Sequence, residues 1–175
     1  MNENITQTRA TGAIEMLISD HQTIKSLLTQ LTRSSDSGTR KQTLEELKGL
    51  LTIHNSLEEN IVYPALAQIA RKHTESMHLY EETAAADVLI FEIDTMLKEN
   101  DDSDFTAKAE TLQKAVFEHI EDEEQKAFRD LREKAEPQEM QMLDTSAQEF
   151  RRKFRFDGAG ERATMRAETG EIRSD

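Results

Sequence analysis

The spacing of apolar residues constrains the fold of this chain most strongly. Apolar side chains recur at alternating intervals of three and four residues, the pattern of a helix that buries one face against other helices. The first such stretch runs roughly from Thr11 to Thr32. Its predicted buried positions are Ile14, Leu17, His21, Ile24, Leu28 and Leu31. Only six Gly and two Pro occur in 175 residues, which leaves few turn-formers for a sheet and favours an all-α protein.

Three more stretches with this periodicity follow. The second helix should start near Thr39, after the polar segment 34–38, and the fourth should follow the loop 100–104, whose side chains we expect to cap it. The predicted buried positions are Leu44, Leu47, Leu51, His54, Glu58, Ile61 and Ala65, then Leu79, Thr83, Ala86, Ile90, Ile93 and Leu97, then Phe105, Ala109, Leu112, Val116, His119, Glu123, Ala127 and Leu131. Antiparallel packing puts the end of the second helix near Gln68, although no Gly or Pro stands there.

The end of the chain divides into a further helix and a tail. Pro137 suits the first turn of a fifth helix. Its apolar face, which should dock on the bundle, comprises Met140, Leu143, Ala147, Phe150 and Phe154. Residues 156–175 are charged, contain Gly and have almost no large apolar side chains. The prediction is an antiparallel four-helix up-down bundle with an additional C-terminal helix over 11–155, and a disordered tail over 156–175.

Five ionisable residues interrupt the apolar positions of these helices. They are His21, His54, Glu58, His119 and Glu123. Burying such groups without partners costs several kcal/mol each, roughly, so each needs compensation. A lone buried His is more often a hydrogen-bonded structural residue than a ligand. Three His and two Glu together indicate a bound cation, which would compensate both carboxylates; the alternative is a buried network of His–Glu pairs.

The spacing of these residues is repeated in the two halves of the chain. His54 and Glu58 are four residues apart, so they share one helix face, and His119 and Glu123 repeat this arrangement. The longer patterns are H-x-x-x-E-E-x-x-x-Y-P and H-x-x-x-E-E-x-x-x-F-R. The helices before them also correspond, with Thr83 in the place that His21 holds in the first half. The chain therefore resembles a duplicated helical hairpin whose halves share one centre.

The residue types limit the metal. Imidazole and carboxylate ligands suit iron, manganese or zinc, and the absence of Cys excludes thiolate sites and iron–sulfur clusters. Five candidate ligands favour a dinuclear site over a single zinc ion. Ferritin-type di-iron bundles use Glu-x-x-His with a spacing of three, whereas this chain has His before Glu with a spacing of four.

The sequence Asp20-His21-x-x-Ile24 and the two H-x-x-x-E motifs resemble the hemerythrin-like family, also called the HHE cation-binding domain. The resemblance covers roughly Ile14 to Leu131, and the fifth helix is similar to an extra C-terminal helix of some bacterial members. It implies a four-helix bundle around a di-iron centre. By resemblance, one iron would bind His21 and His54, the other would bind His119, and the bridging carboxylates would be Glu58 and Glu123.

The chain departs from the family pattern at Thr83, where members usually carry a histidine for the second iron. We therefore expect a weakened second iron site. Glu82 and Asp87 lie nearby and could substitute, while His73 and His78 are expected at the surface. Two aromatic residues of the motifs, Tyr63 and Phe128, are expected in the core. Arg129 stands where the family usually has Pro, which affects only the local helix geometry.

Charge and hydropathy restrict the partners. Lys and Arg total 22 and Asp and Glu total 35, a net charge of -13, which disfavours nucleic acid and anionic membrane surfaces. Residues 1–9 lack an apolar signal core and no apolar run reaches the length of a membrane span, so we expect a cytoplasmic protein.

The leading functional hypothesis is an iron protein that binds, senses or scavenges a small ligand such as dioxygen, nitric oxide or peroxide. One alternative is a metal-dependent enzyme that decomposes peroxide or oxidises iron, although no general acid or base outside the metal ligands is evident. Another is a structural bundle with a degenerate metal site, and Thr83 is the residue that favours it.

Overall fold

The computed structural model describes residues 12–154, and all regular structure within them is helical. The α-helices are α1 (Ala13–Arg33), α2 (Ser37–Leu57), α3 (Tyr63–Gln68), α4 (His73–Glu99), α5 (Phe105–Asp122), α6 (Phe128–Lys134) and α7 (Pro137–Lys153). Two π-helical segments, η1 (Glu58–Val62) and η2 (Glu123–Ala127), continue α2 into α3 and α5 into α6. The all-helical prediction is confirmed, and the predicted tail 156–175 lies outside the described residues.

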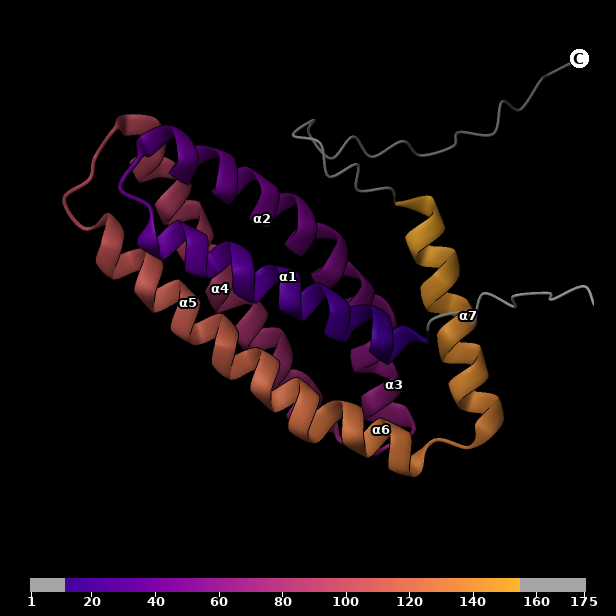
Figure 1. The fold of residues 1–175 in the computed structure, drawn as a ribbon. Helices are drawn as coiled ribbons and strands as arrows, with labels where there is room; N and C mark the ends of the chain where they lie inside the picture. The colour runs from indigo at the N-terminus through magenta and orange to yellow at the C-terminus, as the bar shows by residue number, and fades with distance from the viewer. Residues whose placement is uncertain (1–11, 155–175) are drawn as a thin grey trace, which may run out of the picture.

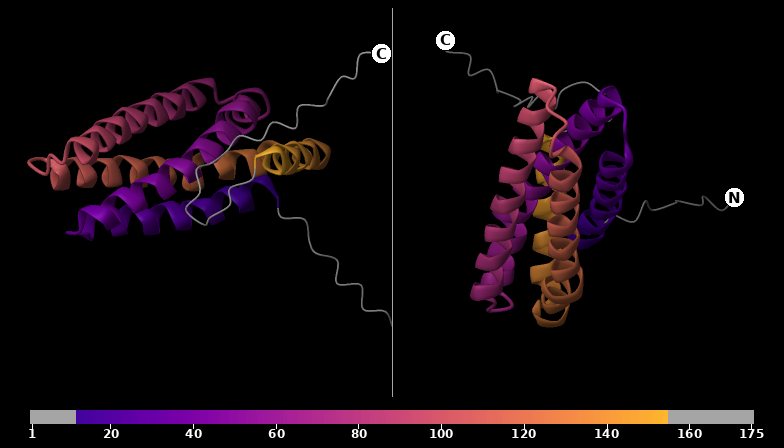
Figure 2. Two further views of the ribbon diagram at one scale, coloured as in Figure 1. Left: turned by 90° about the horizontal axis from the view of Figure 1, so that it is seen from above. Right: turned by 90° about the vertical axis from the view of Figure 1, so that its left-hand side faces the viewer.

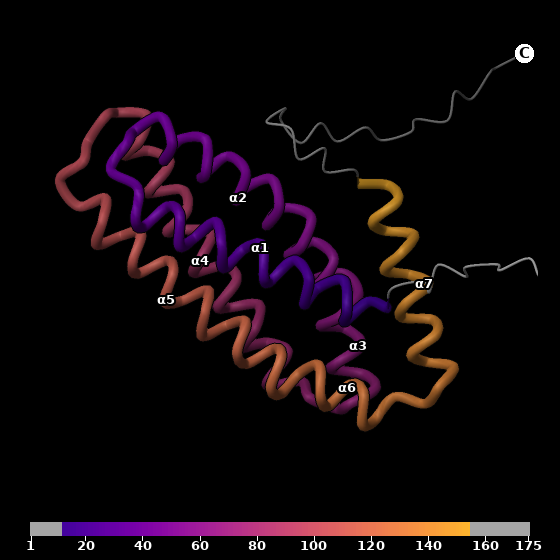
Figure 3. The backbone as a smooth tube through the Cα atoms, in the orientation of Figure 1, coloured from indigo at the N-terminus to yellow at the C-terminus, as the bar shows by residue number. Residues whose placement is uncertain are grey.

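The long helices form a bundle. Helix α1 packs on α2 and α5, and α4 packs on α5 and α2, so that the four lie side by side along the molecule (Figure 1). The backbone passes through η1 and η2 without a break, as the tube in Figure 3 shows. Helix α7 lies across one end of the bundle in Figure 1, and the left view of Figure 2 shows it at that same end. None of the helices over residues 12–154 is long and apolar enough to cross a membrane.

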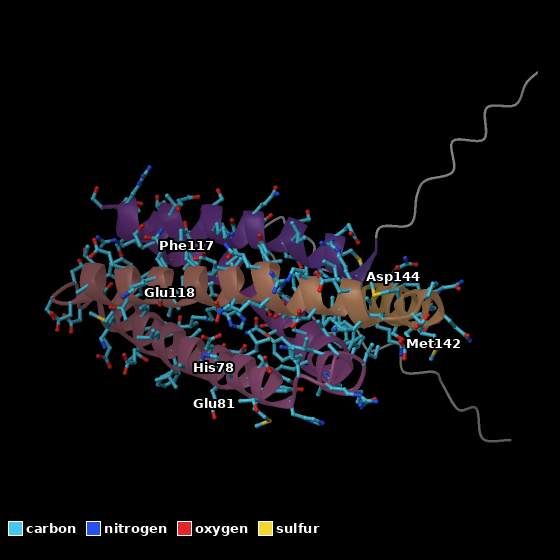
Figure 4. The ribbon with its side chains drawn as sticks, turned by 90° about the horizontal axis from the view of Figure 1, so that it is seen from below. His78, Glu81, Phe117, Glu118, Met142 and Asp144 are labelled. Carbon is cyan, nitrogen blue, oxygen red and sulfur yellow. The ribbon has the colours of Figure 1, made fainter. Side chains whose placement is uncertain are left out.

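Helix α7 docks on the bundle through apolar and polar contacts. Leu143 and Ala147 are buried against the bundle, as the predicted apolar face requires. Pro137 occupies the first turn, as predicted. The side chain of Asp144 accepts a hydrogen bond from the backbone N–H of Ala13, 2.8 Å away, at the start of α1 (Figure 4). Helix α7 therefore provides the polar cap of the first bundle helix.

Two helix starts differ from the sequence prediction. Asp36 accepts a hydrogen bond from the backbone N–H of Thr39 at 2.7 Å, so α2 begins at Ser37, two residues before the predicted start. The expected capping of α5 is wrong, because Asp104 precedes the helix without a side-chain cap. Instead Asp101 accepts from the N–H of Ser103 within the loop, at 2.9 Å.

The connection between α3 and α4 contains a backbone conformation that its residue type disfavours. Helix α3 ends at Gln68, where antiparallel packing required an end. Three residues later, Arg71 has a φ of 58°, in the left-handed region. Asn100, which ends α4 with a φ of 55°, is a residue that tolerates this region. The chain thus turns at Arg71 without the glycine that would relieve the strain.

We expect Arg71→Gly to raise the free energy of unfolding by about 0.5–1 kcal/mol. The left-handed conformation costs a residue with a Cβ about 1–2 kcal/mol, and the greater freedom of glycine in the unfolded chain offsets part of the gain. Asn100→Gly is the matched control and should gain less. Urea denaturation of both variants measures this; a loss of stability in Arg71→Gly would mean that the Arg71 side chain contributes more than the strain.

A polar layer divides the buried core into two apolar clusters. The first apolar cluster, at the α7 end, includes Leu17, Leu57, Val62, Leu66, Leu79, Ala127, Phe128, Leu131 and Leu143. The second apolar cluster includes Ile24, Leu28, Leu47, Leu51, Ile90, Ile93, Leu112, Val116 and Ile120. Leu17 and Ile24 belong to different clusters, and His21 lies between them on α1. The apolar periodicity therefore places the ionisable residues at one level of the bundle.

Candidate metal centre

All five predicted site residues are buried in the polar layer between the two apolar clusters. His21 comes from α1, His54 from α2 and His119 from α5, while Glu58 and Glu123 are the first residues of η1 and η2. Both glutamates have no exposed surface, and His119 is 9% exposed. Three separate helical stretches thus direct imidazole and carboxylate groups into one volume.

The closest group comprises four of the five residues. The ligand atoms of His21, His54, Glu58 and Glu123 all lie within 4.8 Å of one another. His54 Nε2 is 3.1 Å from Glu58 Oε1, and His21 Nε2 is 3.2 Å from Glu123 Oε2 and 3.8 Å from Glu58 Oε1. His119 approaches from the other side, with Nε2 3.5 Å from Glu123 Oε1. Each carboxylate of the site therefore has one oxygen toward His21.

Unpartnered polar atoms test whether this arrangement suits a cation. Three buried atoms make no hydrogen bond: His21 Nε2, Glu58 Oε1 and Glu123 Oε2. The nitrogen nevertheless lies within 4 Å of both oxygens. Buried polar atoms are rarely left without partners, because the desolvation costs roughly 1–3 kcal/mol each. These nitrogen and oxygen donors suit a divalent or trivalent cation such as iron, manganese or zinc.

The two glutamates begin π-helical turns. The N–H of Tyr63 bonds to the carbonyl of Glu58, and the N–H of Phe128 bonds to that of Glu123, both across five residues. Such bulges are frequent at functional sites. Pro64 closely follows the first of these turns and is a residue type that kinks helices. The irregularity, however, starts before Pro64 and recurs in the second half, where Arg129 takes the equivalent place, so proline is not required for it.

Each site histidine has a carboxylate at its second ring nitrogen. His21 Nδ1 is 2.8 Å from Glu124, His54 Nδ1 is 3.3 Å from Asp20, and His119 Nδ1 is 2.9 Å from Glu82. A carboxylate at Nδ1 favours the tautomer whose Nε2 lone pair is free to bind a metal. All three Nε2 atoms face the buried carboxylates. Sequence reasoning missed this role of Glu124 and Asp20.

Tyr63 reaches into the site from α3. Its hydroxyl donates to Glu123 Oε1 at 2.8 Å, and lies 3.3 Å from Glu58 Oε2 and 3.3 Å from His119 Nε2. The sequence analysis placed Tyr63 in the core; it is fully buried, but its hydroxyl belongs to the centre. Burial and the charge of Glu58 raise the pKa of Tyr63, which keeps it protonated in the metal-free protein. Phe128 is core, as expected, and stacks on the ring of His21.

The residues considered as substitutes for a histidine at position 83 lie outside the fully buried cluster. Thr83 is buried, and its hydroxyl donates to the carbonyl of Leu79 in its own helix at 3.0 Å. Glu82 contacts the outer nitrogen of His119, not the inner one. His78, on the outer side of α4 in Figure 4, is 58% exposed and pairs with Glu82 at 3.1 Å. Asp87 is exposed. The expectation of a surface position for His78 is confirmed.

The charges of the site shift the pKa of its members. Burial alone would lower the pKa of His21, but the adjacent carboxylates of Glu123 and Glu58 outweigh it and raise the pKa to about 9. The pKa of His54 is likewise raised against burial, by Glu58, and that of His119 by Glu123. Burial and the charge of Glu58 raise the pKa of Glu123. In the metal-free protein, a proton on His21 therefore offsets part of the charge of the carboxylates.

This balance predicts that the metal-free protein loses stability in alkali. His21 is unexposed, and its folded-state pKa of about 9 exceeds its ordinary value of 6.5. Its contribution, at most about 3 kcal/mol, is complete below pH 6.5 and disappears as the pH rises through 9. Urea denaturation of chelated protein from pH 6 to 9.5 measures this. His21→Gln should flatten the profile and exposed His73→Ala should not; a wild-type profile that rises over this window would contradict the assignment.

Comparison with known proteins bears on the same residues. A model of the family described as the hemerythrin HHE cation binding domain matches residues 12–131. The match spans α1 to α6 and includes every residue of the buried His–Glu cluster, while α7 lies beyond it. A search of the curated proteins found no match. With the geometry and more than half of the chain in agreement, the chain belongs to the hemerythrin HHE cation-binding family.

Proposed function

We propose that this chain is a non-haem iron protein with two ions, the second bound more weakly. The proposed metal ligands are His21, His54, Glu58, His119 and Glu123. The three buried, unpartnered atoms His21 Nε2, Glu58 Oε1 and Glu123 Oε2 carry this proposal, because a cation would satisfy all of them. We also propose that the described helices form an antiparallel up-down four-helix bundle to which α7 is an addition.

We further propose that the protein binds, senses or scavenges a small ligand such as dioxygen, nitric oxide or peroxide. Iron in this site would supply a redox-active centre with coordination positions that the protein leaves open. A cavity of about 20 Å³ lies beside the site, which is room for one water-sized molecule. Its lining is mostly apolar and comprises Ile24, Leu51, His54, Asn55, Thr83, Ala86, Ile90, Val116, His119 and Ile120.

The cavity allows a direct test of ligand binding. Ala86→Leu should fill the space beside Thr83 without removing any proposed ligand, and Ala85→Leu places the same side chain at an exposed position of α4. Iron content and optical spectra are measured first, and nitric oxide is then titrated into the ferrous protein. We expect both variants to keep iron and only Ala86→Leu to bind nitric oxide at least tenfold more weakly, by about 1.4 kcal/mol. Equal affinities would contradict the use of this cavity.

Tyr63 favours a second candidate, an enzyme that decomposes peroxide or oxidises iron. Its hydroxyl is a proton-bearing group at the centre that is neither imidazole nor carboxylate, and sequence reasoning did not find one. Such a group would be placed to supply a proton to a small ligand in the site. Peroxide turnover by iron-loaded wild type, lost in Tyr63→Phe while the iron is retained, would support an enzyme. Turnover that is equal in both would leave Tyr63 without a catalytic role.

A further inference from the structure

The three site histidines differ in what lies behind their carboxylate partners. In each case a cationic or titratable side chain contacts the carboxylate from its outer side. The three chains of contacts are His21–Glu124–Lys25, His119–Glu82–His78 and His54–Asp20–Arg151. Two of them end at the surface of the bundle helices, within the residues that match the family. The third ends at α7, outside that match.

The contact from α7 is the most enclosed of the three. Arg151 is 23% exposed, against 39% for Lys25 and 58% for His78. Its Nη2 donates to Oδ2 of Asp20, and the same oxygen lies 3.3 Å from His54 Nδ1. The Nε atom of Arg151 is buried without a partner. Burying a guanidinium is costly unless it is paired, so the ion pair with Asp20 is what holds this side chain inside.

We propose that Arg151 is a positioning residue of the metal centre, acting through Asp20 on His54, so that iron retention depends on the docking of α7. This inference rests on the proposed iron site. The guanidinium fixes the Asp20 carboxylate, which orients the His54 ring so that Nε2 faces Glu58. Because the guanidinium contacts the same Asp20 oxygen as His54 Nδ1, its positive charge offsets part of the negative charge beside the imidazole. Helix α7 thus adds a cation to the surroundings of one ligand.

The proposal predicts opposite effects for its two partners. Arg151→Met removes the cation, so the unbalanced charge of Asp20 should stabilise ferric over ferrous iron and lower the midpoint potential. The less constrained His54 should also release iron to a chelator about tenfold faster. Asp20→Asn should raise the potential, and adding Arg151→Met to it should change the potential little. Arg151→Lys, which keeps the charge, should restore most of the wild-type potential.

Two controls separate this role from simple docking of α7. Arg152→Met makes the same charge change at the exposed neighbouring position and should leave iron release and potential unchanged. Leu143→Ala weakens the apolar packing of α7 while keeping Arg151. The iron release rate and the midpoint potential of Arg151→Met and Leu143→Ala are compared with the stability that each variant loses in the apo-protein. If both variants follow one and the same relation to this loss, the positioning role is overturned. Wild-type protein that holds no iron would overturn the proposed function and this role with it.

Discussion

Replacing Glu58 by alanine should release iron from the protein and remove most of the thermal stabilisation that iron provides, whereas Glu59→Ala should do neither. Glu58 is unexposed and contacts His54, His21 and Tyr63. Glu59 is partly exposed and directly follows it. Removing this carboxylate should lower the iron affinity at least about a hundredfold. Mutation of a residue that only hydrogen-bonds to a metal ligand already lowers metal affinity by up to about that factor.

The thermal effect follows from linkage. Because the site exists only in the folded bundle, free iron at a hundred times its dissociation constant adds about 2.7 kcal/mol to the free energy of unfolding. For a chain of this size that corresponds to roughly 6–10 °C in Tm. Each variant is melted with and without chelator, so that only its own metal-dependent shift counts. Glu58→Gln, which keeps the volume, guards against a general loss of folding in Glu58→Ala.

Similar shifts for Glu58→Ala and Glu59→Ala would show that the assignment of the buried face is wrong. Equal melting of wild type with and without metal, in protein shown to hold iron, would contradict the dependence of the site on the folded bundle. Both outcomes can be read from the same set of melting curves, provided that iron content per chain is measured on each sample.

The helices, and the level along the bundle at which the His–Glu cluster lies, were predictable because both follow from one periodicity. The three- and four-residue spacing that buries Leu17 and Ile24 also buries His21, so an ionisable residue in that series must lie in the core. The same reasoning identified His54, Glu58, His119 and Glu123 as one group. What it could not give is the register of neighbouring helices to within an ångström, which decides which Nε2 faces which oxygen.

The carboxylates that contact the Nδ1 atoms of the site histidines could have been predicted from the sequence. Asp20 precedes His21 but contacts His54, and Glu124 follows Glu123 but contacts His21. Neighbours in sequence lie about 100° apart around a helix, so a residue beside a buried position faces the adjacent helix of the bundle. An acidic residue next to each site position is therefore a candidate partner for the next helix's histidine. Arg151 had no such signal, because the docking angle of α7 is not encoded in its periodicity.

The role of Tyr63 was not predictable from spacing alone. An aromatic residue on a buried helix face is usually core, and Tyr63 is indeed packed in the first apolar cluster. Its hydroxyl reaches Glu58 and Glu123 where the π-helical turn η1 ends and α3 begins. A π-helical turn adds a residue within one turn and so changes the direction of the side chains that follow it. The motif H-x-x-x-E-E-x-x-x-Y-P marks the position of the tyrosine but not its direction.

Tyr63 changes what should be expected of the second ion. Glu58 and Glu123 each turn one oxygen toward His21 and the other toward the Tyr63 hydroxyl. That hydroxyl also lies 3.3 Å from His119 Nε2, so it occupies the surroundings in which an ion bound by His119 would sit. As a protonated donor it competes with such an ion for both oxygens. The wild type should therefore bind one ion tightly and a second weakly, with fewer than two irons per chain.

Restoring a histidine at Thr83 should raise the iron occupancy in part, and should bring it close to two only if this hydroxyl is also removed. The Thr83 hydroxyl oxygen is 3.5 Å from that of Tyr63, so a new imidazole would meet the phenol, although the cavity beside Ala86 gives part of the space for the ring. We expect irons per chain to increase from wild type to Thr83→His, and to approach two in Thr83→His/Tyr63→Phe. Imidazole is a far better ligand for divalent iron than a hydroxyl. Ferrous titration with metal analysis measures the series.

The single variant Tyr63→Phe decides how the phenol acts. If the hydroxyl competes with the second ion, its removal should leave the first ion in place and strengthen the second. Loss of the second ion in Tyr63→Phe would mean the reverse, that Tyr63 helps to bind it in place of the absent histidine. Wild-type protein that already binds two ions with similar affinity would require such a substitute. Tyr63 would be the first residue to assign to it, because its oxygen lies within 3.3 Å of His119 and of both carboxylates.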